Sequence, residues 1–236
     1  MNILTLVPFE GFVPIMTQIV CGVYRDTGDK RICYISLNKP YKAMVTTFQS
    51  EGLDTDRFHI IDAVTRMAMP NPKAVDNGTY VTSPSALGEI YNAFSNLLEQ
   101  EDFGAVILDS ISTILVYEQP GTVIKFLHML ITKASVKGCH GAFICLKEDT
   151  NPQLLRELNM LVDVVRDYAK DTPVQAEMES KGQQQPPPQP QAQAPPPAEK
   201  RPGFLGRLFG RKGIKALAPA QVSDGTKGSQ DAHKGT

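Results

Sequence analysis

The chain has 236 residues, a net charge of −1 and 42% apolar residues, enough for one domain of ordinary size and some further sequence. Charge is unevenly spread, because residues 1–170 hold 15 Lys and Arg against 19 Asp and Glu, whereas residues 171–236 hold 9 against 6. No stretch reaches the ~18 apolar residues of a membrane-spanning helix, and the short apolar start lacks the basic residues of a secretory signal. The four cysteines show no CxxC spacing and lie in apolar segments, so we expect reduced thiols in a cytoplasmic protein.

Strands and helices are predicted to alternate from the N-terminus onward. Continuous apolar runs predict buried strands, and apolar residues three or four apart predict helices. Thr65–Val81 has little periodicity and is expected to be a loop, and Ser83 or Ser85 is expected to cap the helix that follows. The elements predicted in this half are strands at Ile3–Val7, Arg31–Leu37 and Phe58–Asp62 and helices at Pro14–Arg25, Lys39–Glu51 and from the serines to about Leu98.

The same alternation continues in the second half. Ala105–Leu108 is a predicted strand that ends in Asp109-Ser110. Pro120 stands where a helix can begin, because a proline at the first helical position loses no hydrogen bond. The remaining predicted elements are helices at Val123–Lys137 and Pro152–Leu158 and strands at Gly141–Leu146 and Met160–Val165.

This alternation is typical of an α/β fold in which helices cover both faces of a mostly parallel central sheet, three layers in all. Ligands bind such sheets at the carboxyl ends of the strands, so function is sought there. We expect this α/β domain at residues 1–170. Beyond it we expect a Gln- and Pro-rich disordered linker at 171–199, a basic amphipathic segment at 200–217 and a disordered terminus at 218–236.

The segment after the first predicted strand occupies the place of a phosphate-binding loop but lacks its working residues. A loop of the form GxxxxGK[ST] holds phosphates with backbone amides and lysine, and Mg²⁺ with a hydroxyl. Within residues 7–14, Val13 replaces the lysine and Pro14 replaces the hydroxyl residue. Gly11 alone remains of the glycine-rich turn, and Glu10 would add negative charge beside a phosphate. These residues alone do not mark a nucleotide site, and a degenerate phosphate loop is expected only because of the segments that surround them.

Four further segments form a series, at Lys30–Pro40, Phe48–Asp62, Ala105–Ser110 and Gly138–Leu146. In order and spacing they resemble the RecA superfamily, specifically its KaiC-like branch, which is common in archaea. The resemblance covers about residues 2–168 and implies a three-layer RecA-like P-loop fold. It also implies that Ala105–Ser110 is a Walker B-like strand, which places Asp109 and Ser110 in the Walker B position.

The resemblance further implies which catalytic group is missing. Family members carry an acidic pair after the second strand that activates the attacking water, and the corresponding residues here are Asn38 and Lys39. Neither is a base for water at neutral pH, because an amide has no basic form and an exposed lysine is protonated. Phosphoryl transfer depends on positioned charge, so loss of the lysine, the hydroxyl and the acid predicts a pseudo-ATPase rather than an enzyme. No cofactor is expected, and ATP with Mg²⁺ is the less favoured alternative.

Several of these residues have simpler interpretations. Asp109 at a strand end can hydrogen-bond to the following turn instead of holding a metal, and Lys39 can be solvated instead of meeting an anion. Phe9, Phe12 and Val13 suggest an apolar plug in the vacated phosphate site or, alternatively, a partner-binding surface. No metal site is expected, because three histidines lack Cys or carboxylate neighbours at ligand spacing: His59, His128 and His140.

The segment at 200–217, KRPGFLGRLFGRKGIKAL, holds six positive charges and no acid. Its four glycines disfavour a helix in water, so the segment is expected to fold only on binding. Its core resembles the short membrane-targeting helix of MinD-type proteins. An anionic membrane surface is the favoured target, followed by a protein partner and then by nucleic acid. The residues expected to make contact are Phe204, Leu205, Arg207, Leu208, Phe209, Arg211 and Lys212.

The expected function is therefore that of a catalytically inactive KaiC-like protein with a regulatory or scaffolding role. Its partner would be another protein or a second copy, since the resemblance implies side-by-side assembly. The expected location is cytoplasmic, with possible peripheral attachment at the inner membrane face. Two alternatives stay open: a switch that binds nucleotide without hydrolysing it, and an ATPase that works with atypical residues.

Overall fold

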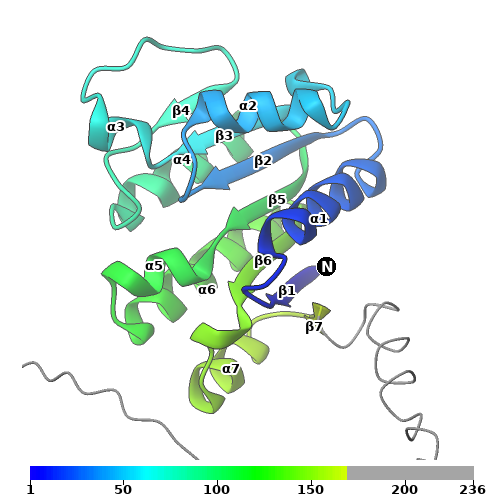
Figure 1. Cartoon of the computed structure of the whole chain (residues 1–236), viewed down its shortest axis with the longest axis vertical. Coiled ribbons are helices and arrows are strands. Elements are labelled where there is room, and N and C mark those ends of the chain that lie inside the picture. Colours follow the sequence, from blue (N-terminus) through cyan, green and yellow to red (C-terminus); the bar gives the residue numbers. More distant parts are fainter. Residues whose placement is uncertain (169–236) are drawn as a thin grey trace, which may run out of the picture. The chain divides into compact units, whose positions relative to one another are not determined.

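The computed structural model describes residues 1–168 (Figure 1). They form a seven-stranded sheet in the order β4-β3-β2-β5-β6-β1-β7, and every neighbouring pair of strands is parallel. The predicted α/β class with a mostly parallel sheet is thereby confirmed. The strands are β1 (Asn2–Val7), β2 (Arg31–Ser36), β3 (Phe58–Asp62), β4 (Gly78–Tyr80), β5 (Phe103–Asp109), β6 (His140–Leu146) and β7 (Val164–Asp167).

Helices cover both faces of this sheet and complete the three layers. The helices are α1 (Phe12–Asp26), α2 (Tyr41–Ser50), α3 (Thr65–Ala68), α4 (Leu87–Gln100), α5 (Ile111–Tyr117), α6 (Pro120–Val136) and α7 (Pro152–Asn159), with 3-10 turns at Thr55–Arg57 and Lys147–Asp149. No helix within residues 1–168 has the length and apolar character needed to cross a membrane.

Two apolar cores lie between the sheet and these helices. α1 and α2 pack on one face with Tyr34 and Ile107, whereas α4, α5, α6 and α7 pack on the other face with Cys33 and Ile35. Because successive residues of a strand point to opposite faces, β2 contributes to both cores and is apolar along most of its length. This two-sided burial explains why the strands are continuous apolar runs in the sequence.

Three parts of the chain differ from the predicted elements. Thr65–Val81, expected to be a loop, contains α3 and β4, and pairing with β3 holds the short strand β4 in place. α5 is absent from the sequence-based prediction, because its β-branched residues favour strands. The last strand lies at Val164–Asp167 instead of Met160–Val165, since Met160 still caps α7.

The predicted serine cap of α4 is wrong. α4 begins at Leu87, and Ala86 precedes it without a side-chain cap. The hydroxyl oxygens of Ser83 and Ser85 lie 2.9 Å apart and bond to each other instead. Instead, Glu89 in the first turn of α4 bonds back to the preceding segment: its carboxylate accepts a hydrogen bond from the N–H of Thr82 at 2.9 Å.

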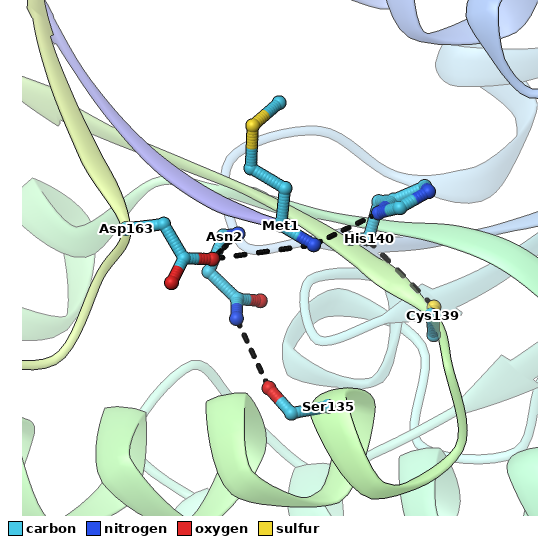
Figure 2. A network of polar contacts seen from close by, with 6 residues as sticks. All are labelled: Met1, Asn2, Ser135, Cys139, His140 and Asp163. Carbon is cyan, nitrogen blue, oxygen red and sulfur yellow. Dashed lines mark hydrogen bonds and ion pairs between the residues drawn. The ribbon is translucent and has the colours of Figure 1, made fainter.

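The amino ends of β1, β6 and β7 are joined by the polar contacts of Figure 2. The N–H of Asn2 donates to Asp163 Oδ2 at 2.6 Å, and Asn2 Nδ2 donates to Ser135 Oγ at 3.0 Å (Figure 2). The Met1 amino group lies 2.9 Å from His140 Nδ1. These contacts hold the start of β1 between its neighbouring strands, at the edge of the sheet opposite to the strand ends discussed next.

The carboxyl ends of β1, β2, β3, β5 and β6 meet at one edge of the sheet. Val7 pairs with Leu146, and Ser36 pairs with both Asp62 and Asp109. β5 and β6 separate β1 from β2, so the turn after β1 lies beside the end of β6. This edge therefore brings together the residues that the sequence marks as a degenerate nucleotide site.

Candidate functional site

The turn after β1 leads through Gly11 directly into α1. Gly11 precedes α1 in the left-handed conformation, with φ of +84°, which favours glycine. α1 begins at Phe12, two residues before the predicted start at Pro14, because a proline is tolerated in the first turn, where its missing N–H has no intrahelical acceptor. Val13 and Pro14 thus lie in the first turn of α1, where a GxxxxGK[ST] loop carries its lysine and hydroxyl.

A carboxylate lies against this turn. The N–H of Phe9 donates to Oε1 and Oε2 of Glu148, each 3.2 Å away. Glu148 belongs to the turn that follows β6, the strand paired with β1. The adjacent cation, Lys147, is paired with Asp167 at 2.9 Å. An amide that could face a phosphate oxygen is therefore bonded to an acid of the same chain.

A second amide of the turn is also bonded within the chain. The N–H of Phe12 donates to the carbonyl of Phe9 at 3.2 Å. Pro14 has no N–H at all. The first turn of α1 consequently offers fewer donors to an anion than an ordinary helix N-terminus.

The apolar residues of the turn do not share one role. The side chains of Phe9 and Val13 are solvent-facing, with 70% and 59% of each residue exposed, whereas Phe12 packs against the core under α1. Of the two interpretations of this apolar group, the plug therefore applies to Phe12 alone. Phe9 and Val13 leave an apolar surface beside the mouth of the turn.

Asp109 ends β5 and is only 4% exposed. Its Oδ2 accepts a hydrogen bond from the Tyr34 hydroxyl at 2.8 Å, and its Oδ1 accepts one from Asn38 Nδ2 at 3.1 Å. Burial raises the pKa of Asp109 above its ordinary value, while the hydrogen bonds from Tyr34 and Asn38 lower it. Burial also raises the pKa of Tyr34, which therefore remains a donor at neutral pH. The side-chain partners of Asp109 thus come from β2 and the residues after it rather than from the following turn.

Asn38 and Lys39 are the residues that the sequence analysis expects at the position of a lost catalytic acid. Asn38 links Asp109 to α5, because its Oδ1 accepts a hydrogen bond from the hydroxyl of Thr113. That hydroxyl also lies 3.2 Å from the hydroxyl of Ser110. Lys39 is half-buried and close enough to lower the pKa of Asp109. The Walker B-like residues and the lost-acid position form one network of internal hydrogen bonds.

A cavity of about 110 Å³ opens beside this network, between α1 and α2. Its walls are mostly apolar and include Met16, Met44 and Phe48. Asp109 and Lys39 lie among the polar residues that line it. The candidate site therefore combines a turn whose Phe9 amide donates to Glu148 with a mostly apolar cavity that the sequence did not predict.

Two acids at this edge have roles that the sequence analysis missed. Glu148 holds the turn after β1, as described above. Asp62 is fully buried and accepts hydrogen bonds from the N–H groups of Tyr41, Val64 and Thr65 at 2.7–2.8 Å. The Asp-x-x-Thr pattern at 62–65 is a usable signal for such a turn, because a strand-end Asp commonly accepts from the amides that follow it. No comparable local pattern marks Glu148.

The structure assigns the histidines no shared site. His59 lies 2.9 Å from the Thr79 hydroxyl, and His140 contacts the Met1 amino group. Within residues 1–168, no group of three or more His, Cys, Asp or Glu side chains is arranged to hold a metal ion. The predicted contact residues of the 200–217 segment, Phe204, Leu205, Arg207, Leu208, Phe209, Arg211 and Lys212, lie outside the described residues.

Comparison with solved structures supports the fold. A KaiC-like protein from the hyperthermophilic archaeon Pyrococcus horikoshii OT3 superimposes with a TM-score of 0.50 and 14% identity, over 70% of this chain and 70% of that one. An uncharacterized protein from Pyrococcus horikoshii, crystallised with an unknown peptide, gives the same TM-score and identity over 70% of this chain and 75% of that one. The predicted RecA-like fold, which this chain shares with a KaiC-like protein, is thus confirmed.

Comparison by sequence identifies a family but not an activity. No curated protein matches the chain. The model of a family of unknown function, DUF7504, matches residues 22–167, which is more than half of the chain and runs from α1 to the end of β7. The chain therefore belongs to the DUF7504 family of unknown function.

Proposed function

We propose that this protein is a pseudo-ATPase: a KaiC-like domain that does not hydrolyse nucleotide and acts as a regulatory or scaffolding protein. The RecA-like fold is one that this domain shares with proteins that use ATP. The residues at the carboxyl edge of its sheet give the reason for inactivity. A domain of this kind acts through its surfaces and partners rather than through turnover.

The contact between Phe9 and Glu148 is the observation that carries the proposal. A phosphate bound at the turn after β1 would take the place of the Glu148 carboxylate at the Phe9 amide. It would also meet Glu10 nearby, without the lysine that normally neutralises a phosphate. Both the hydrogen bonding and the charge of this turn therefore disfavour a polyphosphate.

The lost catalytic groups support the same conclusion. Phosphoryl transfer relies on positioned cations and a water-orienting group, and each can be worth several orders of magnitude in rate. Here Pro14 supplies no Mg²⁺ ligand, and Asn38 supplies no base while it donates to Asp109. A site without the lysine, the hydroxyl and the acid has lost most of what lowers the barrier.

Calorimetry with ATP·Mg²⁺ on the full chain tests this proposal. We expect no binding heat up to millimolar nucleotide and no phosphate release. Micromolar binding without phosphate release would favour the second function, a nucleotide-binding switch. Phosphate release that disappears in Asp109→Ala would identify an ATPase with atypical chemistry and would contradict the proposal.

A restoring variant makes the test sharper. The triple substitution Val13→Lys, Pro14→Ser and Glu148→Ala returns the lysine and the hydroxyl and frees the Phe9 amide from its acceptor. We expect this variant to bind ATP·Mg²⁺ measurably more tightly than the natural chain. If the folded variant binds no more ATP·Mg²⁺ than the natural chain, these three positions do not explain why nucleotide binding is missing.

The second part of the proposal concerns the segment at 200–217, which we propose tethers the domain to an anionic membrane surface at the inner face. Its support is compositional: six cations lie between apolar residues, and each cation gains about 1 kcal/mol near anionic lipid. A protein partner or self-association is the alternative target, and nucleic acid ranks below both.

Vesicle flotation tests the tether. The full chain should float with vesicles that contain anionic lipid, and the full-length variants Arg207→Glu/Arg211→Glu and Phe204→Ala/Phe209→Ala should float much less. Val222→Ala, in the terminus beyond the segment, serves as the control and should float like the natural chain. Equal flotation of all four proteins would eliminate membrane attachment through residues 200–217.

A further inference from the structure

The cavity between α1 and α2 follows from the order of the strands. α2 joins β2 to its direct neighbour β3, whereas α1 joins β1 to β2 across β5 and β6. The two helices pack on the same face of the sheet (Figure 1), but they connect different pairs of strands. The space left between them has a volume of about 110 Å³ and is floored by Tyr34.

The walls of this cavity are mostly apolar. α1 contributes Met16 and Val20, and α2 contributes Met44 and Phe48. A dry apolar cavity of about 150 Å³ holds a benzene molecule. The cavity here is somewhat smaller, so it suits a branched aliphatic group of about four carbons better than an aromatic ring.

Three charged residues line the cavity: Asp109, Lys39 and the exposed Glu51. Asp109 is buried there, and Lys39 is half-buried close beside it. The two oxygens of Asp109 each accept one hydrogen bond, from Tyr34 and Asn38. A carboxylate has about four acceptor positions, so Asp109 can still accept hydrogen bonds from a ligand. No ion pair of Lys39 with an acid at 4.0 Å or less occurs within residues 1–168.

We propose that this cavity binds a small branched aliphatic α-amino acid, with the side chain between α1 and α2, the ammonium group at Asp109 and the carboxylate at Lys39. A zwitterion complements the two charges together, and both of its contacts are charge-assisted hydrogen bonds. A ligand with an amine alone leaves Lys39 unpaired, and a ligand with a carboxylate alone brings a negative charge beside Asp109. The cavity adjoins the phosphate turn, since Phe12 and Val13 of the first turn of α1 line it together with Asp109, and its occupant is therefore tested separately from ATP.

The cavity also contains a natural reporter. Cys21 lies on α1 among the lining residues and is partly exposed, whereas Cys33, Cys139 and Cys145 are buried. A thiol reagent should therefore reach Cys21 first. A molecule bound between the helices shields Cys21, and a label on Cys21 blocks the cavity.

Matched ligands test the proposal on the full chain by calorimetry. L-leucine should bind about tenfold or more tightly than glycine, because only leucine fills the apolar walls. It should also bind more tightly than 3-methylbutylamine, which lacks the carboxylate, and 4-methylpentanoate, which lacks the ammonium. Lys39→Ala should weaken leucine binding severalfold and leave the amine unaffected, while Asp29→Ala, an exposed acid in the turn between α1 and β2, should change neither.

Protection of Cys21 gives a second readout that needs no variant. Leucine should slow the labelling of Cys21, and a chain labelled at Cys21 should no longer bind leucine. The inference is overturned if leucine neither binds nor protects Cys21 at about 10 mM, a concentration that corresponds to a very weak complex. It is also overturned if glycine or the amine alone binds as tightly as leucine. ATP binding is measured separately, so failure here is distinguishable from failure of the proposed function.

Discussion

The N–H of Phe9 donates to both carboxylate oxygens of Glu148, at 3.2 Å each, although 139 residues separate the two in sequence. The parallel pairing of β1 with β6 places them side by side, because Val7 is in register with Leu146. A backbone N–H in this position can donate a hydrogen bond to a bound anion. Here the protein itself supplies the anion, the Glu148 carboxylate.

Glu148→Ala should release the Phe9 amide with little loss of stability. The bond lies at the surface, so its removal should lower the free energy of unfolding by about 1 kcal/mol or less. Hydrogen exchange at the Phe9 amide should become clearly faster. Glu148→Gln keeps an acceptor oxygen and is the matched control. Unchanged exchange at Phe9 in Glu148→Ala would show that this contact does not order the turn.

Tyr34→Phe should destabilise the fold more strongly. It removes a buried hydrogen bond at 2.8 Å and leaves Asp109 Oδ2 without that donor, which typically costs about 1–3 kcal/mol. Burial already raises the pKa of Asp109, and losing the Tyr34 bond should raise this pKa further. The folded state then favours the protonated acid more, so the destabilisation should grow as pH rises above the ordinary Asp range. Urea unfolding at several pH values measures this, and a cost that is constant with pH would contradict it.

The Glu99 carboxylate should contribute stability that is lost in acid. Hydrogen bonds from Lys133 and then Lys137 lower the pKa of Glu99 from its ordinary value of 4.5 to about 2. A lowered pKa in the folded state means that the contribution is present above the unfolded pKa and disappears as pH falls toward about 2. The stability curves of the natural chain and Glu99→Gln should therefore converge in that range. Because Glu99 is exposed, high salt should also reduce the difference; curves that stay parallel down to acid pH would exclude this role.

The thiols should differ sharply in reactivity. Burial raises the pKa of Cys139 to about 12 and that of Cys145 to about 11, and it also raises that of Cys33. Since the thiolate is the reactive form, these three should react only after unfolding. Mass spectrometry after brief labelling of the folded chain should find the modification at Cys21. Early labelling of Cys33 would contradict the packing of β2 in the core.

Much of the fold could be predicted from sequence because the strands are buried on both faces. Runs such as AVIL at residues 105–108 of β5 are unbroken apolar stretches, which indicate a parallel sheet without an alignment. α5 escaped prediction because ISTILVY contains β-branched residues directly after a strand. Its helical state depends on packing against the core through Ile111 and Ile114, which a local pattern does not report.

The candidate site could be predicted only in part, for a similar reason. The groups expected to be missing at Val13, Pro14 and Asn38 could be proposed from the sequence, because each position can be compared with a motif; they stay predictions. The hydrogen bond from Phe9 to Glu148 and the cavity could not be predicted from the sequence, because both depend on which strands and helices become neighbours in the fold. Asp109 illustrates the limit: its position at a strand end was predicted, but its bonds to Tyr34 and Asn38 join positions 75 and 71 residues apart.

The central claim, that the turn after β1 does not hold phosphate, is tested most directly at its own amides. ATP·Mg²⁺ should be titrated into the full chain while the amide resonances of Phe9, Gly11 and Val13 are followed by nuclear magnetic resonance. The account predicts that these three resonances stay unchanged up to millimolar nucleotide. A saturable shift of the three together, with the Phe9 amide leaving Glu148 for the nucleotide, would contradict it.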